Sequence, residues 1–342
     1  MFRITYAQYL EMLTDPDVPD EMIAAFSTFA PSEGSAFEPV LLPDPRWVEM
    51  TDDQIEAESA MRIGNGMARW RRRSAFQRAL NSGDSRPVLV AEGDSWFQFP
   101  VFIQETVAQL GRDYLVSCLS AAGDTARNMV FGPGRRGGRE YMRELDRQSS
   151  RVRAFLFSAA GNDIIGEDEE AGDGTPVLRR ILRRPPAGNT DPDACIDAAE
   201  LKERIDFLTE AYRSVCATIR RDQRFATLPI LVHGYDVPFA YPQPNDRRNP
   251  RWAAKDRWLG SAFAAVGIED VALRRAILTR LIDDLYAMLD RIAAEFPHVH
   301  VVDCRNTLPQ LSDWADEIHA TSEGYAKVAD RFRQTLRSLN IG

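Results

Sequence analysis

The chain has 342 residues, enough to bury a sizeable core and to form one large domain or two modest ones. Hydrophobic residues make up 44% of it and charged residues 27%, as in ordinary globular proteins. The net charge of -9 at pH 7 argues against a general nucleic-acid-binding protein, which is usually basic.

The first 84 residues are expected to form an acidic, mainly helical extension of a main domain at residues 85–342. Nine acidic side chains and two arginines fall within residues 1–50, a formal charge of -7. The extension either wraps the main domain or engages a protein partner. Its helices are predicted at about residues 5–13, 18–28 and 52–80, with a proline-punctuated loop before the third.

Neither the N-terminus nor the basic residues indicate a membrane or nucleic-acid partner. The first residues lack the basic start and apolar stretch of a signal peptide, and no later segment is apolar enough to span a bilayer. Arginine clusters at residues 69–73, 135–139 and 179–184 are interpreted as solvated surface. The four cysteines contain no C-x-x-C pair, which argues against a disulfide framework or a zinc site. We therefore predict a cytoplasmic, reduced protein.

From residue 87 onward, short apolar runs alternate with helical patterns. Each run is nearly continuous, as in strands of a parallel sheet covered on both faces. Right-handed crossovers then predict a doubly wound α/β domain with five parallel strands. The strands are predicted at residues 87–92, 114–120, 153–159, 229–234 and 299–303, and the helices at about 101–111, 137–150, 199–223, 270–295 and 322–339.

Polar residues follow these strands at the end where an open parallel sheet binds its ligands. The fold therefore brings together loops that lie more than 220 positions apart in the sequence. The loops read Gly93-Asp94-Ser95 after the first strand, AAGDT (121–125) after the second, AGND (160–163) after the third and DWADEIH (313–319) after the fifth.

These loops contain the side chains that nucleophilic catalysis requires. A serine hydroxyl such as that of Ser95 is a poor nucleophile until an adjacent base accepts its proton, and His319 is the candidate base. Asp316 lies three positions before His319, so that in a tight turn its carboxylate can face Nδ1 and leave Nε2 for Ser95. Candidate donors to an oxyanion are the Ser95 and Gly123 backbone N–H groups and the Asn162 amide.

The four blocks together resemble the SGNH hydrolase (GDSL esterase/lipase) superfamily over about three quarters of the chain. The letters of that name fall on Ser95, Gly123, Asn162 and His319 in order, and Asp316 completes a triad. The resemblance implies a three-layer α/β/α fold, hydrolysis through an acyl-enzyme, and neither a metal nor another cofactor. Three positions depart from the family pattern: Ala160 replaces a glycine, Ala320 a proline and Trp96 a smaller aliphatic residue.

Several of these residues also have structural interpretations. The alternative for Gly123 is a helix-entry glycine, and the alternative for Asn162 is a brace for its own turn. His233 and Asp236, at the end of the fourth strand, either contact the substrate or brace their loop. A zinc site built from His233, Asp236 and His319 is a minor alternative. Asp94 and Asp163 are expected to hold their turns, and His298 and His300 to be structural.

Two insertions complete the sequence. Residues 238–268 interleave aromatic rings with arginines and lysine, and loops of this length often act as lids. Trp252 and Trp258 lie in this insertion and, together with Trp96, are candidate substrate contacts. They would suit a substrate that has an acyl chain and an anionic head group. A self-packed flap with a charged exterior is the alternative. Residues 166–197 are expected to be irregular and mobile.

We therefore predict a serine esterase or lipase that hydrolyses acyl esters, with a phospholipid or another lipid ester among the candidate substrates. One alternative is a carbohydrate O-deacetylase with the same fold. The other is a non-catalytic protein that keeps the fold and binds a partner through residues 1–84.

Overall fold

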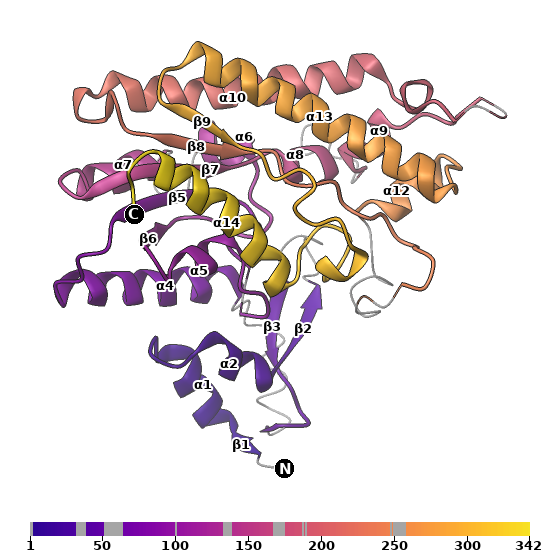
Figure 1. Cartoon of the computed structure of the whole chain (residues 1–342). Coiled ribbons are helices and arrows are strands. Elements are labelled where there is room, and N and C mark those ends of the chain that lie inside the picture. Colours follow the sequence, from indigo (N-terminus) through magenta and orange to yellow (C-terminus); the bar gives the residue numbers. More distant parts are fainter. Residues whose placement is uncertain are drawn as a thin grey trace.

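The computed structural model (Figure 1) describes most of the chain. The described ranges are residues 3–31, 39–50, 64–99, 101–132, 139–166, 175–186, 188, 190–246, 248 and 258–342.

A five-stranded parallel sheet forms the centre of the molecule, which confirms the expected α/β class. The spatial order β6-β5-β7-β8-β9 is that of a flavodoxin-like sheet, in which the second strand lies outside the first. All six residues of β5 are buried, because helices cover both faces. The strands are β5 (Val88–Gly93), β6 (Leu115–Cys118), β7 (Val152–Ser158), β8 (Ile230–His233) and β9 (Val299–Val302).

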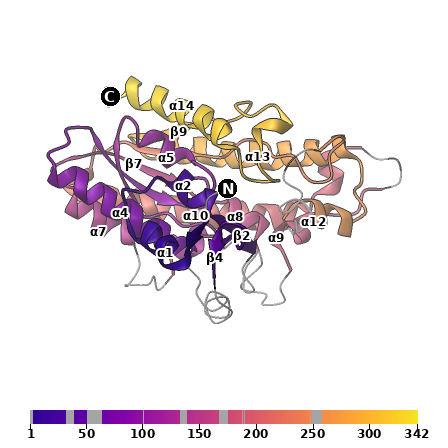
Figure 2. The same cartoon turned by 90° about the horizontal axis from the view of Figure 1, so that it is seen from below.

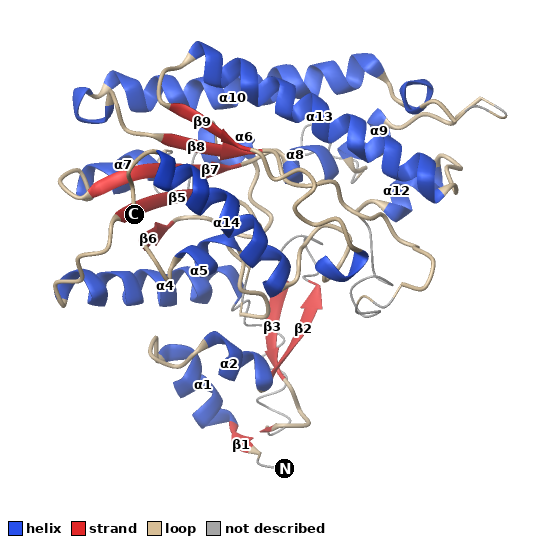
Figure 3. Ribbon diagram, viewed as in Figure 1, coloured by secondary structure: helices blue, strands red, loops and turns tan. Residues whose placement is uncertain are grey.

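Helices cover the sheet on both faces, giving the predicted three layers (Figures 2 and 3). The helix after the first strand and the helix after the last strand pack against each other on one face, and the two longest helices lie on the other. The main helices are α5 (Thr106–Leu110), α7 (Glu140–Arg147), α10 (Ala198–Arg221), α13 (Val271–Glu295) and α14 (Ser322–Ser338), with the short α6 (Ala126–Val130) and α8 (Gly161–Ile165) at strand ends.

The expected helix at residues 101–111 begins only at Thr106. The preceding residues continue the loop from the end of β5, and Gln104 N–H donates to Ser322 Oγ at 3.0 Å. Glu105 caps α5 by accepting from Ala108 N–H. The residues before this cap therefore belong to the loop, and the helix begins after them.

The first 50 residues fold around a small core of their own, and we call the described residues 3–31 and 39–50 the N-terminal module. The expected loop after the second helix is wrong in part, because β2 and β3 form an antiparallel hairpin. Prolines stand at strand ends, where a missing N–H costs little pairing. The elements are β1 (Ile4–Thr5), α1 (Tyr6–Thr14), α2 (Asp20–Ala25), β2 (Ser27–Pro31), β3 (Pro39–Pro43) and β4 (Val48–Glu49).

Helix α4 (Gly64–Asn81) links the module to the sheet by packing beside β6 (Figure 1). Two of its arginines contradict the expectation of a solvated cluster. Arg71 is buried against the module, and Arg72 forms an ion pair with the fully buried Glu105 at 2.5 Å. A domain boundary at residue 84 stays a prediction.

The insertion at residues 166–197 is more ordered than expected in its described part. Helix α9 (Val177–Ile181) and the 3-10 helix η1 (Pro192–Cys195) are joined by a bridge between Leu182 and Ile196. Helix α12 (Gly260–Ala265) of the second insertion packs with them against α13 in a second apolar core. Within the described residues no helix is long and apolar enough to cross a bilayer.

Candidate active site

The end of β5 presents Ser95 at a sharp turn braced by Asp94. Gly93 lets β5 approach β7 closely, since a Cβ there would lie 2.7 Å from both Cβ and O of Ser158. Asp94 Oδ1 accepts from Trp96 N–H at 3.0 Å, which closes the turn around Ser95. Asp94 therefore braces the turn, as expected.

Ser95, His319 and Asp316 lie in one hydrogen-bonded chain. The Ser95 hydroxyl lies 2.9 Å from His319 Nε2, and the opposite ring nitrogen, Nδ1, lies 2.7 Å from Asp316 Oδ2. The carboxylate accepts only from a protonated Nδ1, so Nε2 is left to accept from the serine. The exposed fractions of the three residues are 6%, 4% and 1%. Residues far apart in sequence thus form the arrangement needed to activate a hydroxyl.

The spacing of Asp316 and His319 works because the loop between them is tightly closed. Asp316 Oδ1 accepts the N–H groups of Ile318 at 2.8 Å and His319 at 2.7 Å. Ala315 N–H donates back to His319 O at 2.8 Å. The carboxylate and the imidazole are therefore held by the backbone before any substrate arrives.

Three groups are the predicted donors to an oxyanion: the Ser95 N–H, the Gly123 N–H and the Asn162 amide. Within the described residues, neither the Ser95 N–H nor the Gly123 N–H donates to a protein acceptor. Gly123 has a φ of +82°, in the left-handed region that glycine adopts without strain. Asn162 donates from Nδ2 to Asp124 O at 2.7 Å, which fixes the amide and leaves its second hydrogen for a ligand.

Asp163 ties the second and third loops together. Its carboxylate accepts from Ala126 N–H at 2.8 Å and Arg127 N–H at 3.3 Å, so it braces backbone as expected. Burial raises the pKa of Asp163 to about 6. Ala160, three positions earlier, has a φ of +116°, so its backbone is strained.

A buried network beneath Ser95 includes residues that the sequence did not single out, Ser158 and Tyr235. His233 Nδ1 accepts from Tyr235 N–H at 3.3 Å, so Nε2 carries the proton that it donates to Ser158 Oγ at 2.8 Å. Ser158 in turn donates to Asp94 at 3.0 Å. Tyr235 OH donates to the other oxygen of Asp94 at 2.5 Å and accepts from Gly161 N–H at 2.9 Å.

This network favours a bracing role for His233 over a substrate contact. The side chain is fully buried, and its ring stacks on Phe97 with centroids 5.4 Å apart. Burial lowers the pKa of His233 to about 3 and raises that of Asp94 to about 6, although three donors favour the charged carboxylate. No signal in the sequence identifies Ser158, since its partners meet only in the folded chain.

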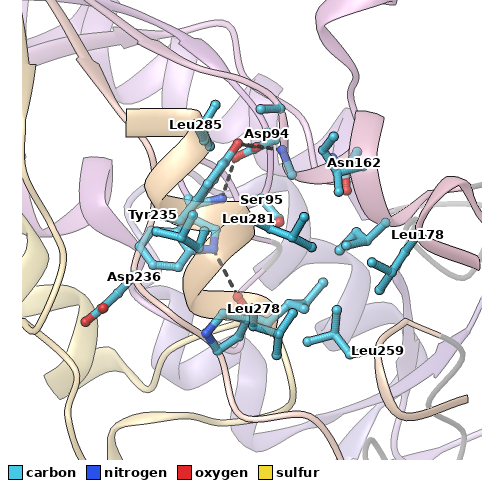
Figure 4. Close-up of a pocket in the computed structure, with 18 of the residues that line it drawn as sticks. Asp94, Ser95, Asn162, Leu178, Tyr235, Asp236, Leu259, Leu278, Leu281 and Leu285 are labelled. Atoms are coloured by element: carbon cyan, nitrogen blue, oxygen red, sulfur yellow. Dashed lines mark hydrogen bonds between the residues drawn. The ribbon is translucent and has the colours of Figure 1, made fainter. Parts of the chain in front are cut away.

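Asp236 also braces its loop. Its backbone lies at the cavity, but its carboxylate accepts from the N–H groups of Asn306 at 3.0 Å and Leu308 at 2.6 Å and points away from Ser95 in Figure 4. The zinc alternative fails as well. His233, Asp236 and His319 are each committed to separate partners, and the described residues contain no group of three or more ligands suited to a metal.

The three candidate tryptophans have different positions. Trp96 is buried among aromatic rings, lines the cavity, and donates from its indole N–H to Ile318 O at 3.0 Å. It thereby links the Ser95 turn to the His319 loop. Trp258 lies edge-on to the His319 ring, with centroids 5.6 Å apart. Trp252 lies outside the described residues.

The second insertion is attached next to the His319 loop. The fully buried Glu317 accepts from Leu259 N–H at 2.8 Å and Gly260 N–H at 2.7 Å, and also from Tyr241 N–H. Arg248 donates to Asp316 O at 3.0 Å. These contacts explain how an insertion far along the chain supports the turn that carries Asp316.

The described part of this insertion favours the self-packed flap over a rim of exposed rings and cations. Phe263 is fully buried, and Arg248 is buried in an ion pair with Asp246 at 2.5 Å. The guanidinium of Arg275 lies over the Phe239 ring, 3.8 Å from its centroid. Among the described residues of this insertion, Arg248 and Phe263 are buried, and Phe239, Tyr241 and Trp258 are half-buried.

An apolar cavity of about 100 Å³ opens beside Ser95 (Figure 4). Helices α8, α9, α10 and α13 contribute most of its aliphatic wall, and Leu259 of the second insertion also lines it. The polar residues among its lining are Asp94, Ser95, Asn162, Tyr235 and Asp236. The aliphatic wall consists of Ile164, Ile165, Leu178, Leu201, Ile205, Leu208, Leu259, Leu278, Leu281, Ile282 and Leu285.

No family model matches this chain, and no curated protein matches it. Solved structures similar to it include an extracellular lipase from Streptomyces rimosus, 15% identical with a TM-score of 0.43, where the match covers 72% of this chain and 99% of that one. A phospholipase A1 from Streptomyces albidoflavus is 12% identical, with a TM-score of 0.42 and coverage of 73% and 99%. A carbohydrate esterase family 3 protein from Talaromyces cellulolyticus is 13% identical, with a TM-score of 0.37 and coverage of 74% and 97%. Likeness at this level carries no argument about what this chain does.

Proposed function

We propose that the protein is a serine esterase that hydrolyses aliphatic acyl esters through an acyl-enzyme. The observation that carries the proposal is the hydrogen-bonded chain from Ser95 through His319 to Asp316, located at the mouth of an apolar cavity. Nucleophile, base and orienting acid lie within hydrogen-bond reach of one another, as acyl transfer requires.

In the proposed reaction, Ser95 Oγ attacks the ester carbonyl while His319 Nε2 takes the hydroxyl proton. The negative charge that forms on the carbonyl oxygen is held by the Ser95 N–H, the Gly123 N–H and the Asn162 amide. His319 then returns the proton to the departing alcohol, which leaves an acyl group on Ser95. A water molecule, deprotonated by His319, attacks that acyl group and releases the acid. Asp316 fixes the Nδ1–H tautomer and stabilises the imidazolium.

The cavity supports an aliphatic acyl chain as the group transferred. Leu278, Leu281 and Leu285 line it along one face of α13. Each CH₂ that enters such a wall gains about 0.8 kcal/mol. A carbohydrate O-deacetylase would need polar groups for the sugar and would gain nothing from this wall. A lipid ester is therefore the favoured substrate class, and the compartment and any partner of residues 1–84 stay predictions.

The reaction is tested with Ser95→Ala on nitrophenyl esters and with a fluorophosphonate probe. We expect both turnover and labelling to be lost while the fold is retained. The chain offers a matched control, because Gly83-Asp84-Ser85 repeats the tripeptide of the proposed nucleophile on the surface ahead of β5. Ser85→Ala should keep wild-type turnover. Full activity in Ser95→Ala would refute the mechanism, and absent labelling in the wild type would favour the partner-binding alternative.

The substrate class is tested with a series of esters from acetyl to octanoyl. We expect kcat/KM to rise about fourfold per added CH₂ until the cavity is filled. Leu281→Phe narrows the cavity and should lower the octanoyl-to-acetyl ratio. A maximum at acetyl that Leu281→Phe does not change would favour the O-deacetylase instead.

A further inference from the structure

Val101 adopts a conformation that a β-branched residue rarely takes. Its φ is +58°, in the left-handed region, where crowding at Cβ makes valine a genuine outlier. The residue lies in the loop that runs from the Ser95 turn to α5. Strained backbone of this kind persists only where the surroundings hold it in place.

The surroundings that hold Val101 belong to the N-terminal module. Its side chain is 8% exposed and forms one apolar cluster with residues of the module, among them Tyr9, Leu13 and Ile23. Phe102, the next residue, packs against both this cluster and the main core. The module therefore supplies the burial that compensates for the strained conformation.

The same loop reaches the proposed general base. Two residues before Val101, the buried Phe99 ring lies against the His319 imidazole, with centroids 4.6 Å apart and the planes inclined by 60°. Among the described rings, Phe99 and Trp258 are the two recorded in contact with His319. A shift of Val101 would move Phe99 and remove one of the aromatic rings that pack against the His319 imidazole.

We propose that the N-terminal module positions His319: it captures Val101, and the captured loop holds Phe99 against the imidazole so that Nε2 stays aligned with Ser95. The inference rests on the proposed function, since it assigns Val101 a positioning role for that reaction. It gives the module a role in turnover that requires no contact with the substrate.

The test compares Val101→Ala in the full-length chain with the wild type. The readouts are the rate at which a fluorophosphonate labels Ser95, scored per folded molecule by native mass spectrometry, and the split between kcat and KM. We expect labelling and kcat to fall between about 10-fold and 100-fold while KM is unchanged, because misplacement of a reacting group has this effect. Val101→Ile keeps a β-branched apolar anchor and should recover most of the rate.

Leu13→Ala provides an independent arm, because Leu13 lies on α1 within the module. Leu13→Ala should also lower the labelling rate of Ser95. If both residues act through the same loop, the fold-loss in the Val101→Ala/Leu13→Ala double variant should be smaller than the product of the two single fold-losses. Val299→Ala is the control, since Val299 is equally buried but begins β9 at the opposite end of the sheet.

Wild-type labelling rates in folded Val101→Ala and Leu13→Ala would overturn the inference, as would an equal loss in Val299→Ala. If Val101→Ala does not fold, Leu13→Ala and Val101→Ile decide the question by the same readouts. Failure of the wild type to be labelled at all is a different result, because it refutes the proposed function itself.

Discussion

His233 shows how a residue near the site can act without touching a substrate. It is fully buried and connects the backbone of Tyr235 to the hydroxyl of Ser158. Because burial lowers its pKa to about 3, the ring stays neutral in the folded chain well below the pH at which a free imidazole is protonated. This neutral form is the one that the network requires.

The stability of the protein should therefore carry a pH dependence from this one residue. In the unfolded chain His233 binds a proton below about pH 6.5, whereas in the folded chain it does so only near pH 3. As the pH falls through this window, the free energy of unfolding should fall by about 1.4 kcal/mol per pH unit. His233→Gln removes this contribution, and its amide nitrogen can still donate to Ser158 Oγ.

Urea unfolding at several pH values between 7 and 4 measures that slope. Asp94 and Asp163 make the same contribution to the pH slope in the wild type and in His233→Gln. The difference between the two slopes therefore reports the one proton that His233 binds on unfolding. His298→Gln alters an exposed histidine and should keep the wild-type slope. Parallel slopes for wild type and His233→Gln would show that His233 is not the neutral donor described here.

Gly93 is a second residue with a sharply defined requirement. A side chain at this position would meet both Cβ and O of Ser158 at 2.7 Å and the Phe97 ring at 3.1 Å. Because β5 and β7 pair here through their backbones, neither strand can give way. We expect Gly93→Ala to lower the free energy of unfolding by about 3 kcal/mol or more.

Thermal unfolding checks this expectation against Gly66→Ala. Gly66 lies in α4, and an added Cβ there meets nothing within 4 Å. Alanine is favoured over glycine in a helix by roughly 0.5–1 kcal/mol, so this control should be neutral or more stable. A Gly93→Ala protein as stable as the wild type would mean that β5 and β7 are less closely packed than described.

At the level of elements, the strands were predictable and the connections were not. The five parallel strands begin and end within about two residues of their predicted limits, because continuous apolar runs bounded by polar residues signal buried strands. Helices α9 and α12 span five and six residues, too short to show a helical period. The hairpin of β2 and β3 was hidden because Pro31, Pro39 and Pro43 indicate a loop when read without their partners.

The same limit applies within the site. Ser95, Asp316 and His319 follow predicted strands in recognisable short motifs, and their side chains form one hydrogen-bonded chain. Asn162 lines the same cavity as Ser95. Glu317, in contrast, stands between two of these residues with no visible role in the sequence. Its partners lie about 60 to 80 positions away and reach it only through tertiary folding.

Glu317 should therefore hold the second insertion in place. Glu317→Ala leaves the N–H groups of Tyr241, Leu259 and Gly260 without this acceptor, and loss of hydrogen bonds to a buried charge costs about 3 kcal/mol or more. We expect faster amide hydrogen exchange at Leu259 and Gly260. Glu323→Ala, an exposed change in the first turn of α14, should leave those amides protected. Unchanged exchange in Glu317→Ala would show that other contacts hold the insertion.

Across the whole molecule, Arg71 makes several of the contacts that join the N-terminal module to the rest of the chain. The sequence hid its role, because Arg71 sits in a run of charged residues that is typical of a solvated helix face. Its exposed fraction is only 5%, and its guanidinium covers the end of α1 and the approach to α2. It donates to the carbonyls of Met12 at 3.1 Å, Leu13 at 3.3 Å, Asp15 at 2.5 Å and Val18, and to the carboxylate of Asp20 at 3.3 Å.

Arg71→Met should release the module while the α/β sheet stays folded. Methionine fills much of the same space but leaves those carbonyls without a donor, which we expect to cost on the order of 3 kcal/mol. The sheet has its own core, so the loss should appear as faster hydrogen exchange at residues 4–48 and not in β5 or β7. Arg73→Met, an exposed change on the same helix, is the matched control.

Because the module is proposed to hold Val101, labelling of Ser95 should slow in Arg71→Met as it does in Val101→Ala. Exchange that rises equally in β5 would show instead that module and sheet unfold as one cooperative unit, and Arg71 would then be an ordinary core contact.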